Sequence, residues 1–141
     1  MAFLDEIEKY LQTELPTLAI VKGLMPVTPV EVVVLYEFTG QPSDLGFGTP
    51  GIAYEYPGLQ IVSRGEEGDY VTPRQNVELV RDALAKVQGT TLGDGQGSPD
   101  LYESEYLICH PGSIFLRGLD MNKRPEIACN FTCEKRPQQL V

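Results

Sequence analysis

The amino-acid sequence predicts a single α+β domain, in which an antiparallel or mixed β-sheet of about five strands carries two helices packed on one face. Two stretches repeat hydrophobic residues at helical spacing, and several others alternate in the manner of strands. Strands and helices do not alternate along the chain as they do in parallel βαβ folds. The length of 141 residues is also the usual size of one domain.

Residues 2–15 are expected to form the first helix. Leu4, Ile7 and Leu11 recur at helical spacing, and acidic residues stand early, where the helix dipole favours negative charge. Pro16 disfavours a helical conformation in the residue before it, so the helix is expected to end there.

The second helix is predicted from its end signals as well as from its periodicity. Thr72 has the side chain of an N-cap, Pro73 stands at the first helical position, and Gln75 completes a capping box. Hydrophobic residues then recur along one face, and Gly89 is expected to end the helix. On this interpretation, Thr72→Ala destabilises the protein by about 1 kcal/mol.

Alternating hydrophobic residues predict five strands, at residues 30–38, 59–64, 101–109, 113–119 and 126–135. The first has one wholly apolar face, which is typical of a central strand covered on at least one side. His110, Pro111 and Gly112 are interpreted as a turn that ends a strand. The turn at residues 120–123 is expected to join the last two strands in a hairpin.

Two glycine-rich segments are expected to be long loops. Residues 39–58 also contain prolines and aromatic side chains, which leaves two alternatives open: a binding loop, or a loop that covers one edge of the sheet. Residues 89–100 are expected to form a flexible tip. Residues 18–25 are interpreted as an apolar link, and residues 137–141 as a frayed end.

Charge excludes one large class of function. Twenty acidic residues against eleven basic ones give a net charge of −9, and there is no basic run with which to bind nucleic acid. An acidic protein can lie beside DNA without holding it. No stretch approaches the roughly 20 apolar residues of a membrane span. The first residues do not resemble a signal peptide, so we expect a protein made in the cytoplasm, without a membrane partner.

The three cysteines and the single histidine suggest two chemical sites, neither well supported. Cys109 and His110 are neighbours on a predicted strand and therefore face opposite ways. Cys129 and Cys133 lie roughly 13 Å apart along another strand, too far to share one zinc ion. A Cys/His nucleophile pair has no surrounding motif. The cysteines are better interpreted as small buried hydrophobic residues in a reducing compartment.

The glycine tip at residues 93–97 does not have the features of a ligand loop. It lacks the Gly-Lys-Ser/Thr ending of a phosphate loop and leads to a strand. The spacing of Asp94, Asp100 and Glu103 matches no calcium loop. Carboxylate pairs are expected by chance among twenty acids. We therefore expect no cofactor, no metal and no enzymatic activity.

Two segments, PGLQIVSRG at residues 57–65 and GLDMNKRPEIACNF at residues 118–131, carry a resemblance to a known family. With the first helix and the strand at residues 30–38, they resemble the minor capsid (tail terminator) proteins of long-tailed bacteriophages. The likeness covers most of the chain. The resemblance implies a hexameric ring at the head-proximal end of the tail tube. This ring stops tube growth and joins the tail to the head connector, while DNA passes through its centre.

The resemblance therefore predicts a structural virion protein that is assembled in the host cytoplasm. Its partners would be other copies of itself, the tail tube protein and a head–tail connector or stopper protein. An acidic turn is expected near the lumen of the ring; it contains Glu66, Glu67 and Asp69. Two alternatives stay open: a head-closure or connector subunit of the same neck, and a small ligand-binding or hydrolytic domain with residues 39–58 as a lid over a pocket.

Overall fold

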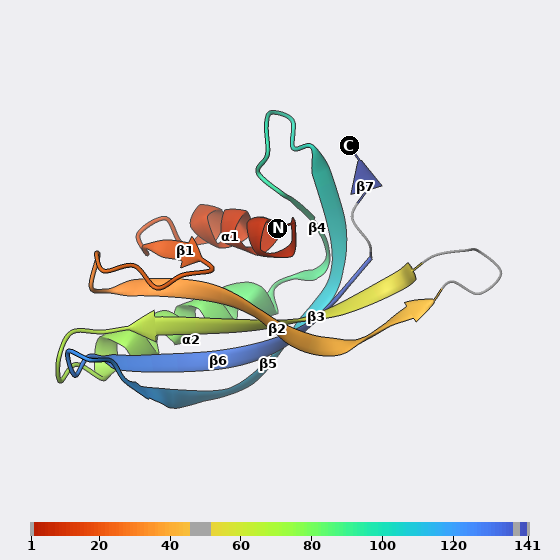
Figure 1. Ribbon diagram of the computed structural model, residues 1–141. Coiled ribbons are helices and arrows are strands. Elements are labelled where there is room, and N and C mark those ends of the chain that lie inside the picture. Colours follow the sequence, from red (N-terminus) through yellow and green to blue (C-terminus); the bar gives the residue numbers. More distant parts are fainter. Residues whose placement is uncertain (1, 46–51, 137–138, 141) are drawn as a thin grey trace.

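The computed structural model describes residues 2–45, 52–136 and 139–140. These residues form two helices and one mixed sheet, so the predicted α+β class is confirmed (Figure 1). In chain order the elements are α1 (Ala2–Glu14), β1 (Ile20–Lys22), β2 (Val32–Leu45), β3 (Ile52–Arg64), α2 (Val71–Ala85), β4 (Gln88–Gly93), β5 (Tyr102–Leu119), β6 (Pro125–Lys135) and β7 (Gln139–Leu140).

The strands lie in the order β1-β2-β3-β6-β5-β4, and β7 pairs with β5. β1 is parallel to β2, whereas the other pairs are antiparallel. The described sheet thus has seven strands where about five were expected. The predicted apolar link contains β1, the predicted glycine tip overlaps β4 from Gly89 on, and the predicted frayed end contains β7. The segments at residues 101–109 and 113–119 are two halves of one long strand, β5.

Both helices pack on the same face of the sheet, as expected. A single hydrophobic core joins α1, α2 and the inward-facing side chains of the strands, among them Leu35, Ile61 and Phe131. α1 contacts both β1 and β4, which lie at opposite ends of the strand order. The sheet must therefore curl around α1 to bring its two sides so near each other. The Tyr10 hydroxyl, which donates to the carbonyl of Ala83 at 2.7 Å, ties α1 to α2.

The opposite face of the sheet, which we call the outer face, is partly covered by the chain segment before β2. Val32 and Val34 on β2 are buried there, outside the core formed with the helices. Arg64 fastens the covering segment, because its guanidinium donates to the carbonyls of four residues: Pro26, Val27, Pro29 and Val30. The first half of β2 is therefore covered on both faces, which explains its unbroken run of hydrophobic residues.

The start of α2 differs from the prediction. Asp69, not Thr72, provides the capping side chain: its Oδ1 accepts from the backbone N–H groups of Val71 and Thr72 at 3.2 and 3.1 Å. The helix begins at Val71, so Thr72 is already inside its first turn. It ends at Ala85, and Gly89 lies in β4 rather than at the helix end. Aspartate and threonine are both common N-cap residues, so the sequence alone does not show which of Asp69 and Thr72 caps the helix. The position of the first helical turn decides between them.

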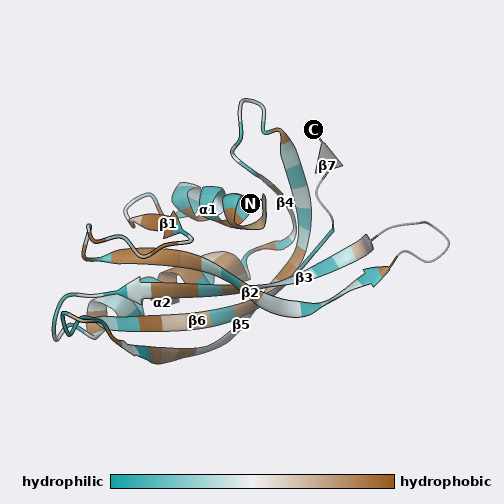
Figure 2. Ribbon diagram, in the orientation of Figure 1, coloured by the Kyte–Doolittle hydropathy of each residue, from teal (hydrophilic) through white to brown (hydrophobic). Residues whose placement is uncertain are grey.

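The predicted loop at residues 39–58 is wrong in its described part. Residues 39–45 and 52–58 continue β2 and β3 as a projection beyond the helices, in which β6 still pairs with β3 at Gly58 and Glu55. Residues 46–51 of the predicted loop lie outside the described residues. We call residues 36–45 and 52–58 the arm (Figure 1). Figure 2 shows hydrophobic colours on the first half of β2 and mostly neutral or hydrophilic colours along the arm.

The glycines and prolines of the arm serve bulges in the strands and not a loop. A Cβ atom on Gly40 would lie 1.8 Å from the carbonyl oxygen of Tyr56, so only glycine permits this approach. The pairing register shifts between Phe38 and Gln41, and again between Gln41 and Asp44. Bulges of this kind accept glycine and proline without ending the strand.

The predicted turn at His110, Pro111 and Gly112 is likewise a bulge inside β5. The register with β6 shifts between Pro111 and Ile114, and β5 continues to Leu119. The predicted tip at residues 89–100 is shorter than expected, because β4 occupies its first part. Of the expected frayed end, residues 137, 138 and 141 lie outside the described residues, whereas Gln139 and Leu140 pair with β5 as β7.

Candidate functional site

The predicted acidic turn lies between β3 and α2, and its three carboxylates have different surroundings. Glu66 and Glu67 are exposed, whereas Asp69 is partly buried and caps α2. The backbone N–H of Thr72 is the main cause that holds the pKa of Asp69 below its ordinary value. Gly65 is required at the start of the turn, because a Cβ there would lie 2.7 Å from the carbonyl oxygen of Asp69. Asp69 is therefore a structural residue, and Glu66 and Glu67 are the carboxylates that this turn presents to solvent.

The two segments that carried the sequence resemblance meet at the same end of the molecule, which we call the turn end. The backbone N–H of Gly65 donates to the carbonyl of Pro125 at 3.0 Å, which places the turn after β3 beside the turn between β5 and β6. In the second turn, Asp120 accepts from the backbone N–H of Asn122 and of Arg124, and its Oδ2 lies 2.7 Å from Nε of Arg124. In Figure 1 this end lies opposite the arm.

The second half of β5 is an unpaired edge of the sheet. β4 pairs with β5 only as far as Ile108, so residues 110–119, which we call the β5 edge, pair with β6 alone among the described residues. Several large hydrophobic side chains are exposed on it or in the turn that follows: Phe115, Leu116, Leu119 and Met121. A strand edge with exposed hydrophobic residues is a template for pairing with another chain.

The arm is an unpaired edge on the other side of the sheet. β1 covers only the stretch of β2 from Val33 to Leu35, and the part of β2 in the arm pairs with β3 alone. Phe38 and Leu45 are exposed along it. No lysine or arginine occurs between Lys22 and Arg64, whereas four acidic residues do: Glu31, Glu37, Asp44 and Glu55. The arm is thus an acidic projection with an open edge.

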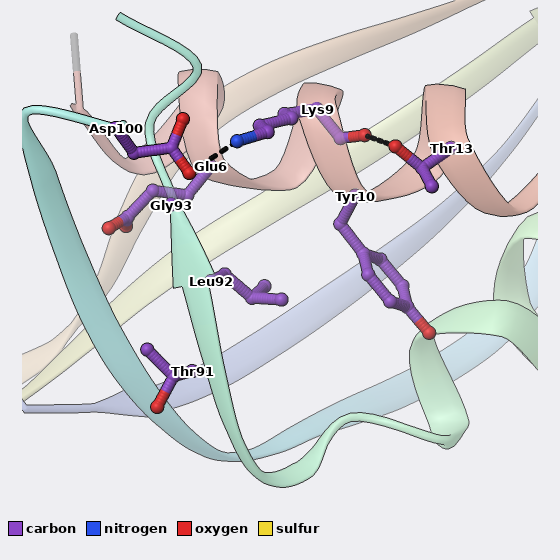
Figure 3. Close-up of a pocket in the computed structure, with 8 residues that line it drawn as sticks. All are labelled: Glu6, Lys9, Tyr10, Thr13, Thr91, Leu92, Gly93 and Asp100. Carbon is purple, nitrogen blue, oxygen red and sulfur yellow. Dashed lines mark hydrogen bonds and ion pairs between the residues drawn. The ribbon is translucent and has the colours of Figure 1, made fainter. Parts of the chain in front are cut away.

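A pocket of about 250 Å³ lies between α1 and β4, away from the arm (Figure 3). Its lining includes Glu6, Thr91 and Leu92, and Lys9 reaches across it to Asp100. It is smaller than the roughly 300–1,000 Å³ typical of small-molecule sites. No arm residue lines it. A separate hollow of about 290 Å³ is lined by arm residues themselves, among them Glu37, Phe38 and Tyr56, and it shares no residue with the pocket between α1 and β4.

A buried ion pair lies beside this pocket. Glu6 Oε1 accepts from Nζ of Lys135 at 2.9 Å and from the hydroxyl of Tyr106 at 2.8 Å, and all three side chains are buried. The ammonium group also lies 5.4 Å from the centre of the Tyr106 ring. Burial, and then the charge of Glu6, raise the pKa of Tyr106 well above its ordinary value, so this hydroxyl stays protonated and donates. The cluster joins α1 to β5 and β6, which is a structural role.

The cysteines and the histidine do not assemble into a site. Cys109, Cys129 and Cys133 are buried in the core, whereas His110 is exposed. A hydrogen bond with Cys109, together with burial, raises the pKa of the Cys133 thiol well above its ordinary value, and burial raises the pKa of Cys129. Buried, protonated thiols are poor nucleophiles. Within the described ranges, no group of three or more His, Cys, Asp or Glu side chains could hold a metal ion.

Sequence reasoning identified the acidic turn but missed both unpaired edges and the Glu6–Lys135 pair. The positions of the two edges depend on where β1 and β4 end. The sequence predicts an apolar link and a flexible tip at these residues, and therefore no strand there. Glu6 and Lys135 are separated by 129 positions along the chain, and no local pattern connects them. In the part of the chain that the structure describes, no helix is long and apolar enough to cross a membrane.

Comparison with known proteins adds a fold likeness. No protein-family model matches the chain, and no curated protein is similar to it. One solved protein structure is similar with a TM-score of 0.53 and 13% sequence identity, over 99% of this chain and 92% of that one. The name of that protein states no activity. At this identity the likeness concerns the fold alone.

Proposed function

We propose that this protein is the tail terminator subunit of a long-tailed bacteriophage, a structural virion protein without catalytic activity. Copies form a ring, a hexamer by analogy with the family, on the head-proximal end of the tail tube. The ring stops polymerisation of the tube protein and binds the head–tail connector or stopper protein. DNA passes through its centre without specific binding.

The observation that carries this proposal is the pair of unpaired edges on opposite sides of one sheet, one of which projects as an acidic arm. A subunit with two different adhesive edges associates head to tail, and head-to-tail association generates a ring where the rotation between copies closes. Two further features support it. The two quoted segments that resemble the family lie side by side on the paired strands β3 and β6, and the net charge of −9 suits a channel that must not retain DNA.

The lumen position is proposed for Glu66 and Glu67 alone, since Asp69 caps α2. A Glu66→Lys/Glu67→Lys variant would then place a ring of positive charge around the DNA path. We expect assembled rings of this variant to bind linear duplex DNA at low salt, with an affinity that falls steeply as salt rises. The matched control is Glu14→Lys/Asp82→Lys, which makes the same charge change at exposed helix positions. Equal DNA binding by both variants would contradict the lumen position.

The proposal as a whole is tested by mixing the purified protein with tail tubes of the parent phage and imaging them in negative stain. A terminator caps one end of each tube and fixes its length, whereas tubes without added protein continue to grow. Tubes that stay uncapped and continue to grow in the presence of the protein would contradict the assignment as a terminator. Binding to purified connectors in place of tubes would identify a neck-connector subunit instead.

A further inference from the structure

The two unpaired edges differ in shape and in charge, and the differences make them complementary. We infer that the β5 edge of one copy binds the arm of a second copy, so that the β2 strand of the arm extends the neighbour's sheet. The contact between two copies is argued from the described residues alone. That a series of such contacts closes into a ring rests on the proposed function.

The hydrophobic side chains of the β5 edge give the contact its apolar part. Leu116 is 52% exposed, Phe115 is 38% exposed, and Met121 in the following turn is 99% exposed. An exposed edge of this composition favours aggregation unless a partner covers it. Phe38 and Leu45 on the arm are exposed hydrophobic residues that can pack against it. Main-chain hydrogen bonds between the two edges would provide affinity, and side chains on either side would provide specificity.

Charge favours the arm of a second copy, rather than a second β5 edge, as the partner of the β5 edge. Residues 110–124 contain Arg117, Lys123 and Arg124 against one acidic residue, Asp120, in a protein whose net charge is −9. Arg124 pairs with Asp120, and Arg117 lies 3.8 Å from Glu126, so the excess positive charge of this stretch rests on Lys123. The arm contains three acidic residues, Glu37, Asp44 and Glu55, and no basic one, although Arg136, which follows β6, lies 5.9 Å from the centre of the Tyr54 ring. Arm-to-edge contact therefore brings opposite charges together, whereas arm-to-arm contact brings like charges together. Repulsion between two acidic arms disfavours the arm-to-arm contact, which is one way in which specific interfaces reject wrong partners.

The positions of the two edges determine the symmetry of the assembly. They lie at different places in the strand order, with β3 and β6 between β2 and β5. A copy that donates its arm to one neighbour still has a free β5 edge for another. Such a heterologous contact propagates until the rotation between copies closes it.

Cysteine cross-linking tests the contact directly, because the native cysteines are buried and leave introduced thiols selective. Ser43 on the arm and Ser113 on the β5 edge are both exposed. Ser43→Cys protein and Ser113→Cys protein are oxidised separately and as a mixture, and the products are separated by non-reducing electrophoresis. We expect cross-linked dimers in the mixture and few in either protein alone.

The outcomes separate this inference from the proposed function. Dimers within Ser113→Cys alone, or within Ser43→Cys alone, would indicate symmetric contacts and overturn the inference. Assembly on tubes without any arm-to-edge cross-link would also overturn it, while leaving the terminator proposal standing. Cross-links in the mixture, together with tubes that stay uncapped, would support the contact and refute the terminator.

A pair of leucine variants provides an independent measure. Leu116→Glu places a charge on the β5 edge, and Leu79→Glu does the same on α2, where Leu79 is 47% exposed. We expect Leu116→Glu to raise the concentration needed for half-maximal association by about tenfold or more, the size of effect that a central hydrophobic contact gives. Leu79→Glu should leave it unchanged. Equal effects from the two variants would overturn the inference.

Discussion

The two halves of β2 belong to two regions held in different ways. The first half lies in the body of the protein, buried by the helices on one face and by the segment that Arg64 fastens on the other. The second half lies in the arm, where β3 is the one strand that pairs with it among the described residues and side chains are exposed. The comparison teaches that one strand can serve two purposes, since burial makes the body stable and the lack of burial leaves the arm free to associate.

The largest change in the stability of the body is expected from removing one partner of its buried ion pair. Lys135→Met leaves the Glu6 carboxylate buried without its cation, which costs about 3–5 kcal/mol of unfolding free energy. Urea denaturation measures it. The neighbouring Arg136→Met is the control, because Arg136 is half exposed and should contribute less than about 1 kcal/mol.

A double variant tests the cause of that loss. Glu6→Leu/Lys135→Met removes both charges, and most of the lost stability should return. A double variant as unstable as Lys135→Met alone would show that the pair does not act through burial of an uncompensated charge.

The next largest loss of stability is expected from Arg64, which fastens the segment before β2 on the outer face. Arg64→Ala removes a buried guanidinium that satisfies four carbonyl groups of the segment before β2, which should cost roughly 2–3 kcal/mol. Arg81→Ala on α2, where Arg81 is partly exposed and lies beside Asp82, is the control, with an expected change within about 0.5 kcal/mol. If the unfolding midpoint of Arg64→Ala equals that of the control, the segment does not depend on Arg64.

The cap of α2 distinguishes the observed helix start from the one that the sequence predicted. Asp69→Ala should lower the urea midpoint more than Thr72→Ala does, because Asp69 accepts both backbone N–H groups. The folded-state pKa of Asp69 is lowered, so its contribution is present above its unfolded-state pKa and is lost as the pH falls through the folded-state pKa. A larger effect of Thr72→Ala would restore the predicted cap.

The smallest effect on stability is expected in the arm. The hydroxyl of Tyr56 donates to the Asp44 carboxylate across the two arm strands, and this hydrogen bond raises the pKa of Tyr56 to about 12. In Asp44→Asn the pKa should fall towards its ordinary value of 10, with no change in the urea midpoint at neutral pH. Nuclear magnetic resonance of tyrosine labelled at Cζ measures it. An unchanged pKa would show that the arm strands do not hold this pair together.

The elements that the sequence predicted best are those whose stability is local. The hydrophobic stripe of α1 is complete within its own residues, and Ile7 and Leu11 are fully buried as expected. The arm was misread because Gly40 serves a close approach to Tyr56, and glycine gives the same signal in a loop. The acidic turn was located correctly, whereas the role of Asp69 depended on where the first turn of α2 begins. The unpaired edges depend on strand pairings between distant parts of the chain, which no local pattern contains.

The most direct test of this account removes the arm and keeps the body. Gln41 and Tyr56 face each other in the sheet, so replacing residues 42–55 with Asn-Gly joins them through a two-residue hairpin. Sedimentation velocity then compares this chain with the full-length protein over a range of concentrations. The account predicts that the full-length protein assembles and that the shortened chain sediments as a compact monomer. A shortened chain that assembles like the full-length protein, or a full-length protein that stays monomeric at every concentration and on tail tubes, would contradict it.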